Sequence, residues 1–172
     1  MAKIPHLGEV SKTDHCKRSA MLKHLVAALA ALVLVLPGAA LGTSTHSESS
    51  LLREINRVRA QYGLGRLTAD THLQRAARSH SREMLGANVF AHGAFGSRMA
   101  RFDVTGHIAG ENLAWGTGAL ATARGIVAAW LASPEHRANL LRPSFKRVGV
   151  GDLVGAFLGH HDAHVVTADF AG

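Results

Sequence analysis

The segment Trp130-Leu131-Ala132-Ser133-Pro134-Glu135-His136-Arg137-Ala138-Asn139-Leu140-Leu141 gives the clearest local structural signal in this sequence. Serine is a preferred residue directly before a helix, proline is favoured at the first helical position, and a glutamate in the first turn interacts well with the helix dipole. A short helix is therefore predicted to begin at Pro134, with Ser133 as its N-cap. His136 would lie in the first turn of this helix.

Upstream of this segment, apolar residues recur at helical spacing. They predict four helices, over residues 51–62, 71–86, 97–102 and 119–132. Thr71-His72-Leu73-Gln74 resembles a capping box, and Gly86 would end that helix. Its expected buried face consists of Leu73, Ala76, Ala77, His80 and Met84. The fourth helix is expected to bury Ile126, Ala129 and Trp130.

Downstream, two segments are rich in β-branched and aromatic residues, as is typical of strands. They cover residues 148–158 and 164–171, and residues 159–163 between them are predicted to form a hairpin loop. Helices therefore precede strands along the chain and do not alternate with them. This order predicts an α+β layered domain with an antiparallel sheet.

The amino-terminal region has the pattern of a secretory signal. Lysine and arginine precede an apolar run at 25–36, and small residues follow at 37–42. We expect residues 1–42 to be a leader and signal peptide, with Met21 as an alternative start and cleavage before Thr43. Residues 43–50 are predicted to be a linker and 51–172 the folded domain. A membrane anchor is the less favoured alternative, because the run is shorter than the roughly 20 residues that span a bilayer.

The composition after this leader limits the classes of function. The only cysteine is Cys16, so the exported domain is expected to contain no disulfide. The whole chain has a formal charge of +7, but from Thr43 onward there are 14 basic and 10 acidic residues, a net charge of +4. The basic residues are scattered and not interleaved with aromatic residues, which argues against nucleic acid as a partner.

Several short motifs occur in order along the predicted domain. They are Asn56-Arg57-x-Arg59, Gly63-Leu64-x-x-Leu67, Phe90-x-His92, Ala109-Gly110-Glu111-Asn112-Leu113-Ala114, Trp130-x-x-Ser133-Pro134-x-His136-Arg137-x-Asn139-x-Leu141, Val148-Gly149-Val150-Gly151 and Thr167-x-Asp169-Phe170. Together they resemble the bacterial branch of the CAP superfamily, which groups cysteine-rich secretory proteins, antigen 5 and pathogenesis-related 1 and is also called the SCP domain. The resemblance implies a three-layer α-β-α sandwich with a central antiparallel sheet, a cleft lined by histidine and glutamate, and a secreted or cell-envelope location.

The resemblance also implies a candidate site. The cleft histidines of the family match His92 and His136, and the glutamate of its Gly-Glu-Asn motif matches Glu111. The family has a second glutamate three residues after the helix tryptophan, but that position after Trp130 is Ser133 here. The predicted site therefore has three candidate ligands in place of four.

Two imidazoles and a carboxylate are ordinary ligands for zinc or another divalent metal, so His92, Glu111 and His136 could form a metal site. Glu111 could instead orient a histidine from outside the coordination sphere or act as a general base. Asn112 and Ser133 are the expected neighbours in the cleft. The N-cap role of Ser133 makes it a poor nucleophile, and no organic cofactor is predicted.

Each of these residues also has a purely structural interpretation. His92 and His136 could be ordinary hydrogen-bonding residues, and Glu111 could accept hydrogen bonds from its own turn. The three histidines of the predicted hairpin, at positions 160, 161 and 164, are expected to be solvated surface residues.

Three classes of function follow, and whether the protein is an enzyme stays open. We favour a non-enzymatic extracellular module for binding or signalling, whose partner is a lipid or sterol, a peptide or a cell-envelope component. The alternative is a metal-dependent extracellular hydrolase, similar to a peptidase, that uses His92, Glu111 and His136. The third class is a structural module with a vestigial cleft.

Overall fold

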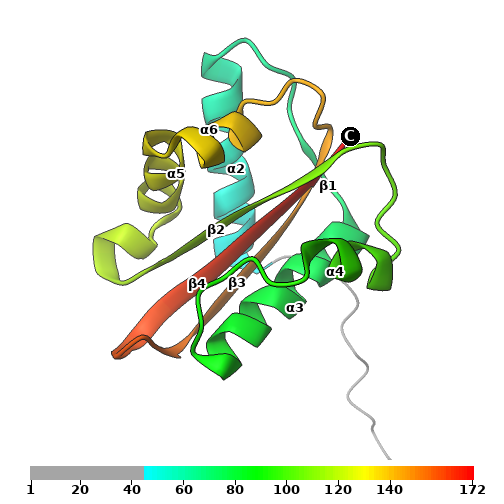
Figure 1. The fold of residues 1–172 in the computed structure, drawn as a ribbon. Coiled ribbons are helices and arrows are strands. Elements are labelled where there is room, and N and C mark those ends of the chain that lie inside the picture. Colours follow the sequence, from blue (N-terminus) through cyan, green and yellow to red (C-terminus); the bar gives the residue numbers. More distant parts are fainter. Residues whose placement is uncertain (1–44) are drawn as a thin grey trace, which may run out of the picture. The chain divides into compact units, whose positions relative to one another are not determined.

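The computed structural model describes residues 45–172, and the ribbon shows a sheet with helices on both faces (Figure 1). The predicted leader, its cleavage site and residues 43–44 of the predicted linker lie outside the described residues. None of the described helices is both long and apolar enough to cross a membrane.

The central sheet has the strand order β1-β3-β4-β2. The strands are β1 (Thr68–Ala69), β2 (Ala109–Gly116), β3 (Arg147–Phe157) and β4 (His160–Ala171). The strand β4 pairs antiparallel with both β2 and β3, whereas the two-residue β1 pairs parallel with β3. The predicted antiparallel arrangement is therefore confirmed for the three long strands, and β1 makes the sheet mixed.

The helices form the two outer layers. One layer contains α2 (His46–Gln61), α5 (Ala123–Ala132) and α6 (Pro134–Leu140), and the other contains α3 (Thr71–Ala87) and α4 (Phe95–Arg101) (Figure 1). A short 3-10 helix, η1 (Gly118–Ala121), precedes α5. This arrangement confirms the α+β class and the three-layer α-β-α sandwich.

The first described helix begins earlier than predicted. Residues 46–50 belong to α2, so the linker prediction is wrong for them. The reason is a capping box: the Thr45 hydroxyl accepts from the Glu48 amide, while the Glu48 carboxylate accepts from the Thr45 amide at 2.8 Å. This reciprocal pair satisfies two backbone donors and allows the Ser-rich segment to become helical.

The helix α3 has the predicted buried face but different ends. Its N-cap is Asp70, whose carboxylate accepts from the amides of His72 and Leu73, so the capping box predicted at Thr71 is wrong. The helix passes Gly86 and ends at Ala87, where Asn88 adopts the left-handed conformation. An aspartate cap one residue earlier therefore replaces the predicted threonine cap.

Three further predictions need correction. The strand β2 was not predicted, because Gly, Glu and Asn are uncommon in strands. The hairpin loop is only Leu158-Gly159, so residues 160–163 belong to β4. In α5, Ala129 is exposed, and Val127 is buried in its place beside Ile126 and Trp130.

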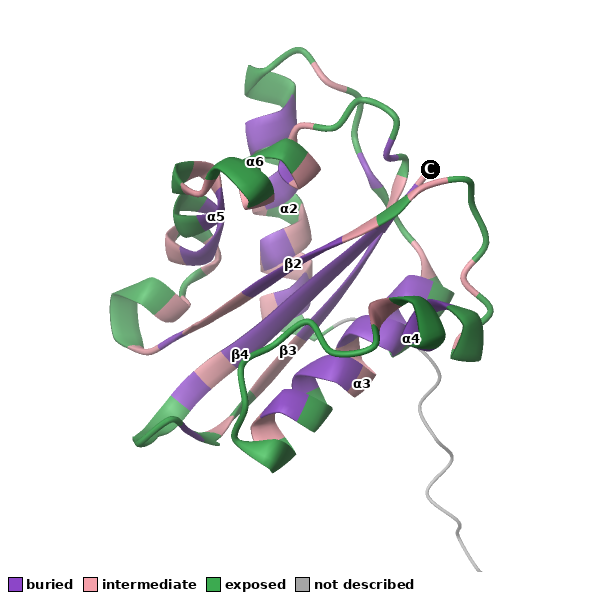
Figure 2. Cartoon of the chain, viewed as in Figure 1, coloured by how far each residue is buried: buried purple, intermediate pink, exposed green. Residues whose placement is uncertain are grey.

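The apolar core lies on both faces of the sheet, and the buried residues follow the strands and the inner faces of the helices (Figure 2). Two glycines of β3 allow α3 to lie unusually close. A Cβ atom at Gly149 would lie 2.0 Å from the Leu73 carbonyl carbon, and one at Gly151 would lie 2.5 Å from the Arg78 amide nitrogen. Any larger side chain at these positions would force α3 away from the sheet.

The edge strand β2 is covered by side chains of the α5–α6 layer. The indole Nε1 of Trp130 donates to the Leu113 carbonyl at 2.8 Å, and the Asn139 amide donates to the Glu111 carbonyl at 3.1 Å. Trp130 is 1% exposed, as predicted for a core residue. These bonds satisfy carbonyl groups that an open sheet edge would leave unpaired.

Candidate functional site

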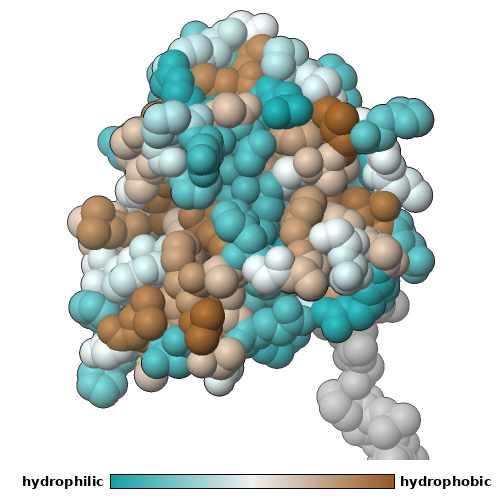
Figure 3. Space-filling view, viewed as in Figure 1, coloured by the Kyte–Doolittle hydropathy of each residue, from teal (hydrophilic) through white to brown (hydrophobic). Residues whose placement is uncertain are grey.

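The predicted site residues come from three elements that meet around β2. Glu111 lies on β2, His92 lies on the connection between α3 and α4, and His136 lies in the first turn of α6. In the space-filling view, polar side chains gather across the middle of this face, with apolar areas on either side (Figure 3). The edge of the sheet therefore forms the base of the candidate site.

The Glu111 carboxylate has a partner on each oxygen. Its Oε1 lies 2.7 Å from His92 Nδ1, while its Oε2 contacts Nη2 of Arg98 on α4. The side chains of Glu111 and Arg98 are both 3% exposed, whereas that of His92 is 59% exposed. Glu111 thus forms a buried ion pair and orients an exposed imidazole.

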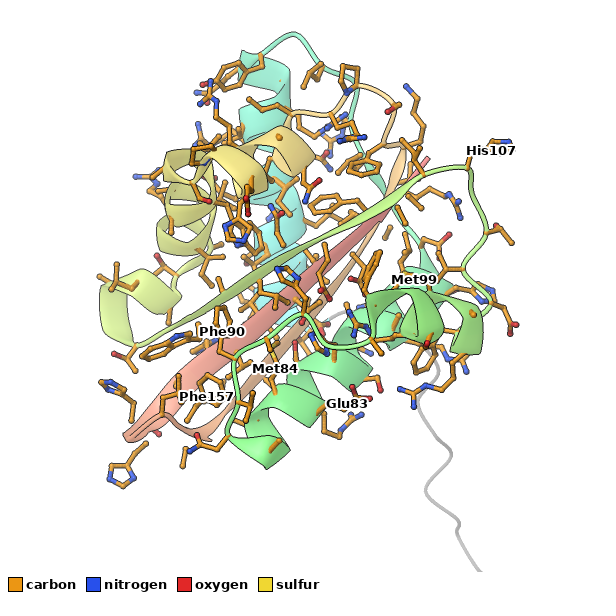
Figure 4. The ribbon with its side chains drawn as sticks, in the orientation of Figure 1. Glu83, Met84, Phe90, Met99, His107 and Phe157 are labelled. Atoms are coloured by element: carbon orange, nitrogen blue, oxygen red, sulfur yellow. The ribbon has the colours of Figure 1, made fainter. Side chains whose placement is uncertain are left out.

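A second histidine approaches the same carboxylate from α3, the helix that carries the labelled Glu83 and Met84 in the stick view (Figure 4). His80 Nε2 lies 3.7 Å from Glu111 Oε2 and 3.0 Å from the Ala91 carbonyl oxygen. Burial lowers the pKa of His80, and the positive charge of Arg98 lowers it further, although Glu111 opposes the shift. The buried imidazole is therefore favoured in its neutral form.

A second carboxyl group, that of Asp169, faces Glu111 in the pairing of β2 with β4. Burial raises the pKa of Asp169 well above its ordinary value, and the neighbouring Glu111 raises it further. Both carboxyl oxygens of Asp169 are buried without a hydrogen-bond partner, which also favours the protonated, neutral form of this group. A neutral carboxyl group therefore lies beside the ion pair of Glu111 with Arg98.

His136 lies beside His92, and both burial and that neighbour lower the pKa of His136. Its carbonyl accepts from the Asn112 side chain at 2.9 Å, and the Asn139 side chain donates to Asn112 Oδ1 at 3.0 Å. Asn112 is fully buried and joins β2 to α6. Ser133 is the N-cap residue of α6 by position, but its side chain makes no capping hydrogen bond, contrary to our expectation.

The donor set does not fit the metal site predicted from the sequence. Both oxygens of Glu111 are engaged, and one of them contacts a buried cation that a metal ion would have to displace. Without Glu111, only His92 and His136 remain of the three predicted ligands. A typical catalytic zinc site has three protein ligands. Across residues 45–172, no three His, Cys, Asp or Glu side chains are grouped closely enough to hold a metal ion.

Sequence reasoning missed the importance of Arg98, Asp169 and His80. Asp169 offered a signal, because a carboxyl group inside an apolar strand needs a partner or a proton. His80 was predicted only as part of a buried helix face, and nothing in the sequence distinguishes Arg98 from the other arginines.

The hairpin histidines lie away from Glu111. His160 packs against Trp115, with ring centroids 5.3 Å apart, while His161 is exposed. His164 lies on β4, as predicted, and its Nδ1 is 2.9 Å from Asp152 Oδ1. The side chain of Asp152 is 2% exposed.

Comparisons with known proteins support the family resemblance described in the sequence. The profile of the cysteine-rich secretory protein family, CAP, matches residues 52–170. The uncharacterized protein YkwD of Bacillus subtilis (strain 168) is 36% identical over 109 residues, which are 60% of this chain and 41% of YkwD. The uncharacterized membrane protein YlbC of the same organism is 34% identical over 113 residues, 62% of this chain and 32% of YlbC. The chain therefore spans less than half the length of either relative.

Solved structures share the fold. An extracellular protein containing a SCP domain from Bacillus anthracis str. Ames has a TM-score of 0.59 and 28% identity, over 76% of this chain and 44% of that one. An outer surface protein from Borrelia burgdorferi has a TM-score of 0.61 and 24% identity, over 76% of this chain and 97% of that one. The profile match covers more than half of the sequence, so the chain belongs to the cysteine-rich secretory protein (CAP) family.

Proposed function

We propose that this chain is an exported CAP domain that binds an anionic amphiphile of the cell envelope and does not hydrolyse it. The names of two structural relatives, an extracellular protein and an outer surface protein, support an extracellular location. The predicted leader supports the same location. Binding and signalling remain compatible, since an occupied binding surface can itself be the signal.

One observation favours binding over hydrolysis, namely that the carboxylate of Glu111 is buried and engaged on both oxygens. A general base must be able to reach the proton that it removes, and a metal ligand must offer a free lone pair. While it is buried and paired with the Arg98 cation, Glu111 is poorly placed for either role. The metal-dependent hydrolase is therefore the less supported alternative.

The ligand class is argued from a groove along α6. Its volume is about 500 Å³, and it is lined by Pro134, Arg137, Ala138, Leu141, Arg142 and Pro143. The apolar side chains suit an acyl chain, and the two arginines suit a phosphate or carboxylate head group.

Both arginines are held against aromatic rings. The guanidinium of Arg137 lies 5.1 Å from the ring centroid of Tyr62, and that of Arg142 lies 5.3 Å from the ring centroid of Phe145. Such stacking restricts the side chains before a ligand arrives, which reduces the entropy cost of binding.

Vesicle co-sedimentation tests this proposal. The purified protein is mixed with vesicles of dioleoylphosphatidylglycerol or, separately, of dioleoylphosphatidylcholine. We expect binding to the anionic vesicles only, and a loss of at least about fivefold in the double variant Arg137→Ala, Arg142→Ala, because two charge-assisted contacts are removed.

The matched control is the double variant Arg66→Ala, Arg82→Ala, which removes the same charge from two exposed positions outside α6. It should bind as the wild type does. Equal losses in the two double variants, or no binding of the wild type to either vesicle, would contradict the proposal.

A further inference from the structure

A second pocket lies where the start of α2, the segment from η1 to α5, and the strands β3 and β4 come together. It shares no lining residue with the groove along α6, and Glu111 does not line it. Its volume is about 390 Å³, within the range of roughly 300 to 1,000 Å³ that is usual for small-molecule sites. Six of its lining residues are polar, namely His46, Ser47, Ser50, Thr122, Asp152 and His164.

The polar wall of this pocket is built around Asp152, whose side chain is 2% exposed. His164 Nδ1 lies 2.9 Å from its Oδ1 and 3.0 Å from its Oδ2, and the Ser47 hydroxyl donates to Oδ2. Because the carboxylate accepts from Nδ1, any contact of the imidazole with a ligand falls to Nε2. Asp152 therefore orients two lining side chains while staying out of reach of a ligand.

The other lining hydroxyl groups also use their hydrogens within the protein. Ser50 donates to the His46 carbonyl at 2.8 Å, and Thr122 donates to the Ala119 carbonyl at 2.8 Å. A hydroxyl group has one hydrogen to donate and two lone pairs that accept. The pocket therefore offers mainly acceptors, and these suit a ligand that is rich in hydrogen-bond donors.

The charges around the pocket favour a ligand without a net charge. Its only lining carboxylate, that of Asp152, is buried, and no arginine or lysine of residues 45–172 lines it. A ligand ammonium or phosphate would lose water there without a counter-ion that it could touch, which is costly. The guanidinium of Arg53 donates to the Ser50 hydroxyl at 2.8 Å, and this positive charge further disfavours a cation.

We propose that this pocket is a second binding site, whose ligand is a sugar. The sugar hydroxyl groups donate to the lining hydroxyls, while Leu51, Ala121 and Ala123 contact its C–H groups. A sugar hydroxyl can donate or accept, so it matches His164 Nε2 in either protonation state. The site is independent of the groove along α6, so the protein can hold a sugar and an amphiphile at the same time.

An amide NMR titration of the purified protein tests the site. The probes are maltose and N,N′-diacetylchitobiose, with cadaverine as an amine of comparable donor capacity. We expect saturable shifts with at least one of the two sugars, centred on the amides of the lining residues, and none with cadaverine. Ala121→Leu fills the pocket from η1 and should weaken sugar binding at least about tenfold.

The matched control is Ala119→Leu, the same substitution in the same 3-10 helix at an exposed position that does not line the pocket. It should bind the sugar as the wild type does. His164→Phe keeps an aromatic ring but removes Nε2, and should weaken binding about fivefold, as expected for one lost hydrogen bond. Because it also removes a partner of Asp152, the dispersion of its NMR spectrum checks its fold, and Ala121→Leu decides the test if it unfolds.

Several results would overturn the inference. These are no saturable shift with either sugar, tighter binding of cadaverine than of both sugars, and equal losses in Ala121→Leu and Ala119→Leu. Shifts confined to α6 would do so as well, because they would place the sugar in the other groove. All folded variants should keep wild-type binding to anionic vesicles, so that failure of this site and failure of the proposed amphiphile binding are distinguishable.

Discussion

At the scale of single residues, Glu111 and Arg98 depend on each other because both are almost fully buried. Removing one partner leaves an uncompensated charge, which typically costs about 3 to 5 kcal/mol. We expect Glu111→Gln to lower the free energy of unfolding by about this amount in urea denaturation.

The double variant Arg98→Met, Glu111→Gln removes both charges and keeps similar volumes. It should recover most of the stability, since replacing a buried ion pair with uncharged groups is often close to neutral. Additive losses in the double-mutant cycle would show that the two side chains do not act as a pair.

Asp169 makes stability depend on pH in the opposite direction to an ordinary ion-paired carboxylate. Its pKa is raised in the folded protein, so the native state keeps a proton that the unfolded chain loses above about pH 3.8. The contribution of Asp169 to the free energy of unfolding is therefore fully present below that pH and decreases as the pH rises toward the folded pKa.

Asp169→Asn should remove this decrease, because the amide is neutral at every pH and has no titrating proton. We expect the variant to be more stable than the wild type at pH 8 by a larger margin than at pH 4, as measured by urea denaturation at both values. The exposed Asp162→Asn is the control, and a margin that does not grow with pH would argue against a protonated Asp169.

At the scale of elements, the closest packing is that of α3 against β3. Gly149→Ala places a Cβ atom 2.0 Å from the backbone of α3, so the helix must shift. We expect a loss of about 3 kcal/mol or more, at the upper end of overpacking costs. Thermal or urea denaturation measures the loss.

Gly86→Ala is the matched control within α3 itself, since a Cβ atom there meets no atom within 4 Å. Alanine is the better helix former, so this variant should gain about 0.5 to 1 kcal/mol. A similar effect of both substitutions would mean that the close approach at β3 does not limit packing.

The elements also show where sequence reasoning succeeds. The buried face of α3 and the start of α6 at Pro134 were predicted, because apolar spacing and proline are local signals. The strand β2 was missed because long-range pairing with β4 determines it, and such pairing leaves no local pattern.

The sequence also predicts only part of the candidate site. The motifs identified His92 and Glu111, and the structure brings these two side chains together. The ion pair with Arg98 and the contact with Asp169 could not be predicted, because each joins residues that only the folded sheet and α4 bring together. The predicted metal chemistry stays untested, but these unforeseen partners weigh against it.

At the scale of the whole molecule, the capping box at Thr45 bears on the predicted signal cleavage, because a chain that began after Thr45 would lose this cap. Cleavage before Thr43, as predicted, keeps both Thr45 and its partner Glu48. Losing an N-cap residue of this kind costs about 1 kcal/mol. Mass spectrometry of the exported protein should therefore give an amino terminus at or before Thr45, and one beyond that residue would contradict the prediction.

The sheet order has a consequence for the time at which the protein can fold. The strands β2 and β3 do not pair with each other, and each instead pairs with β4, which comes after both in the sequence. During synthesis the sheet therefore cannot close until β4 has left the ribosome. If the predicted amino-terminal signal directs export, a nascent chain of this topology would still lack its closed sheet when it reaches a translocation channel.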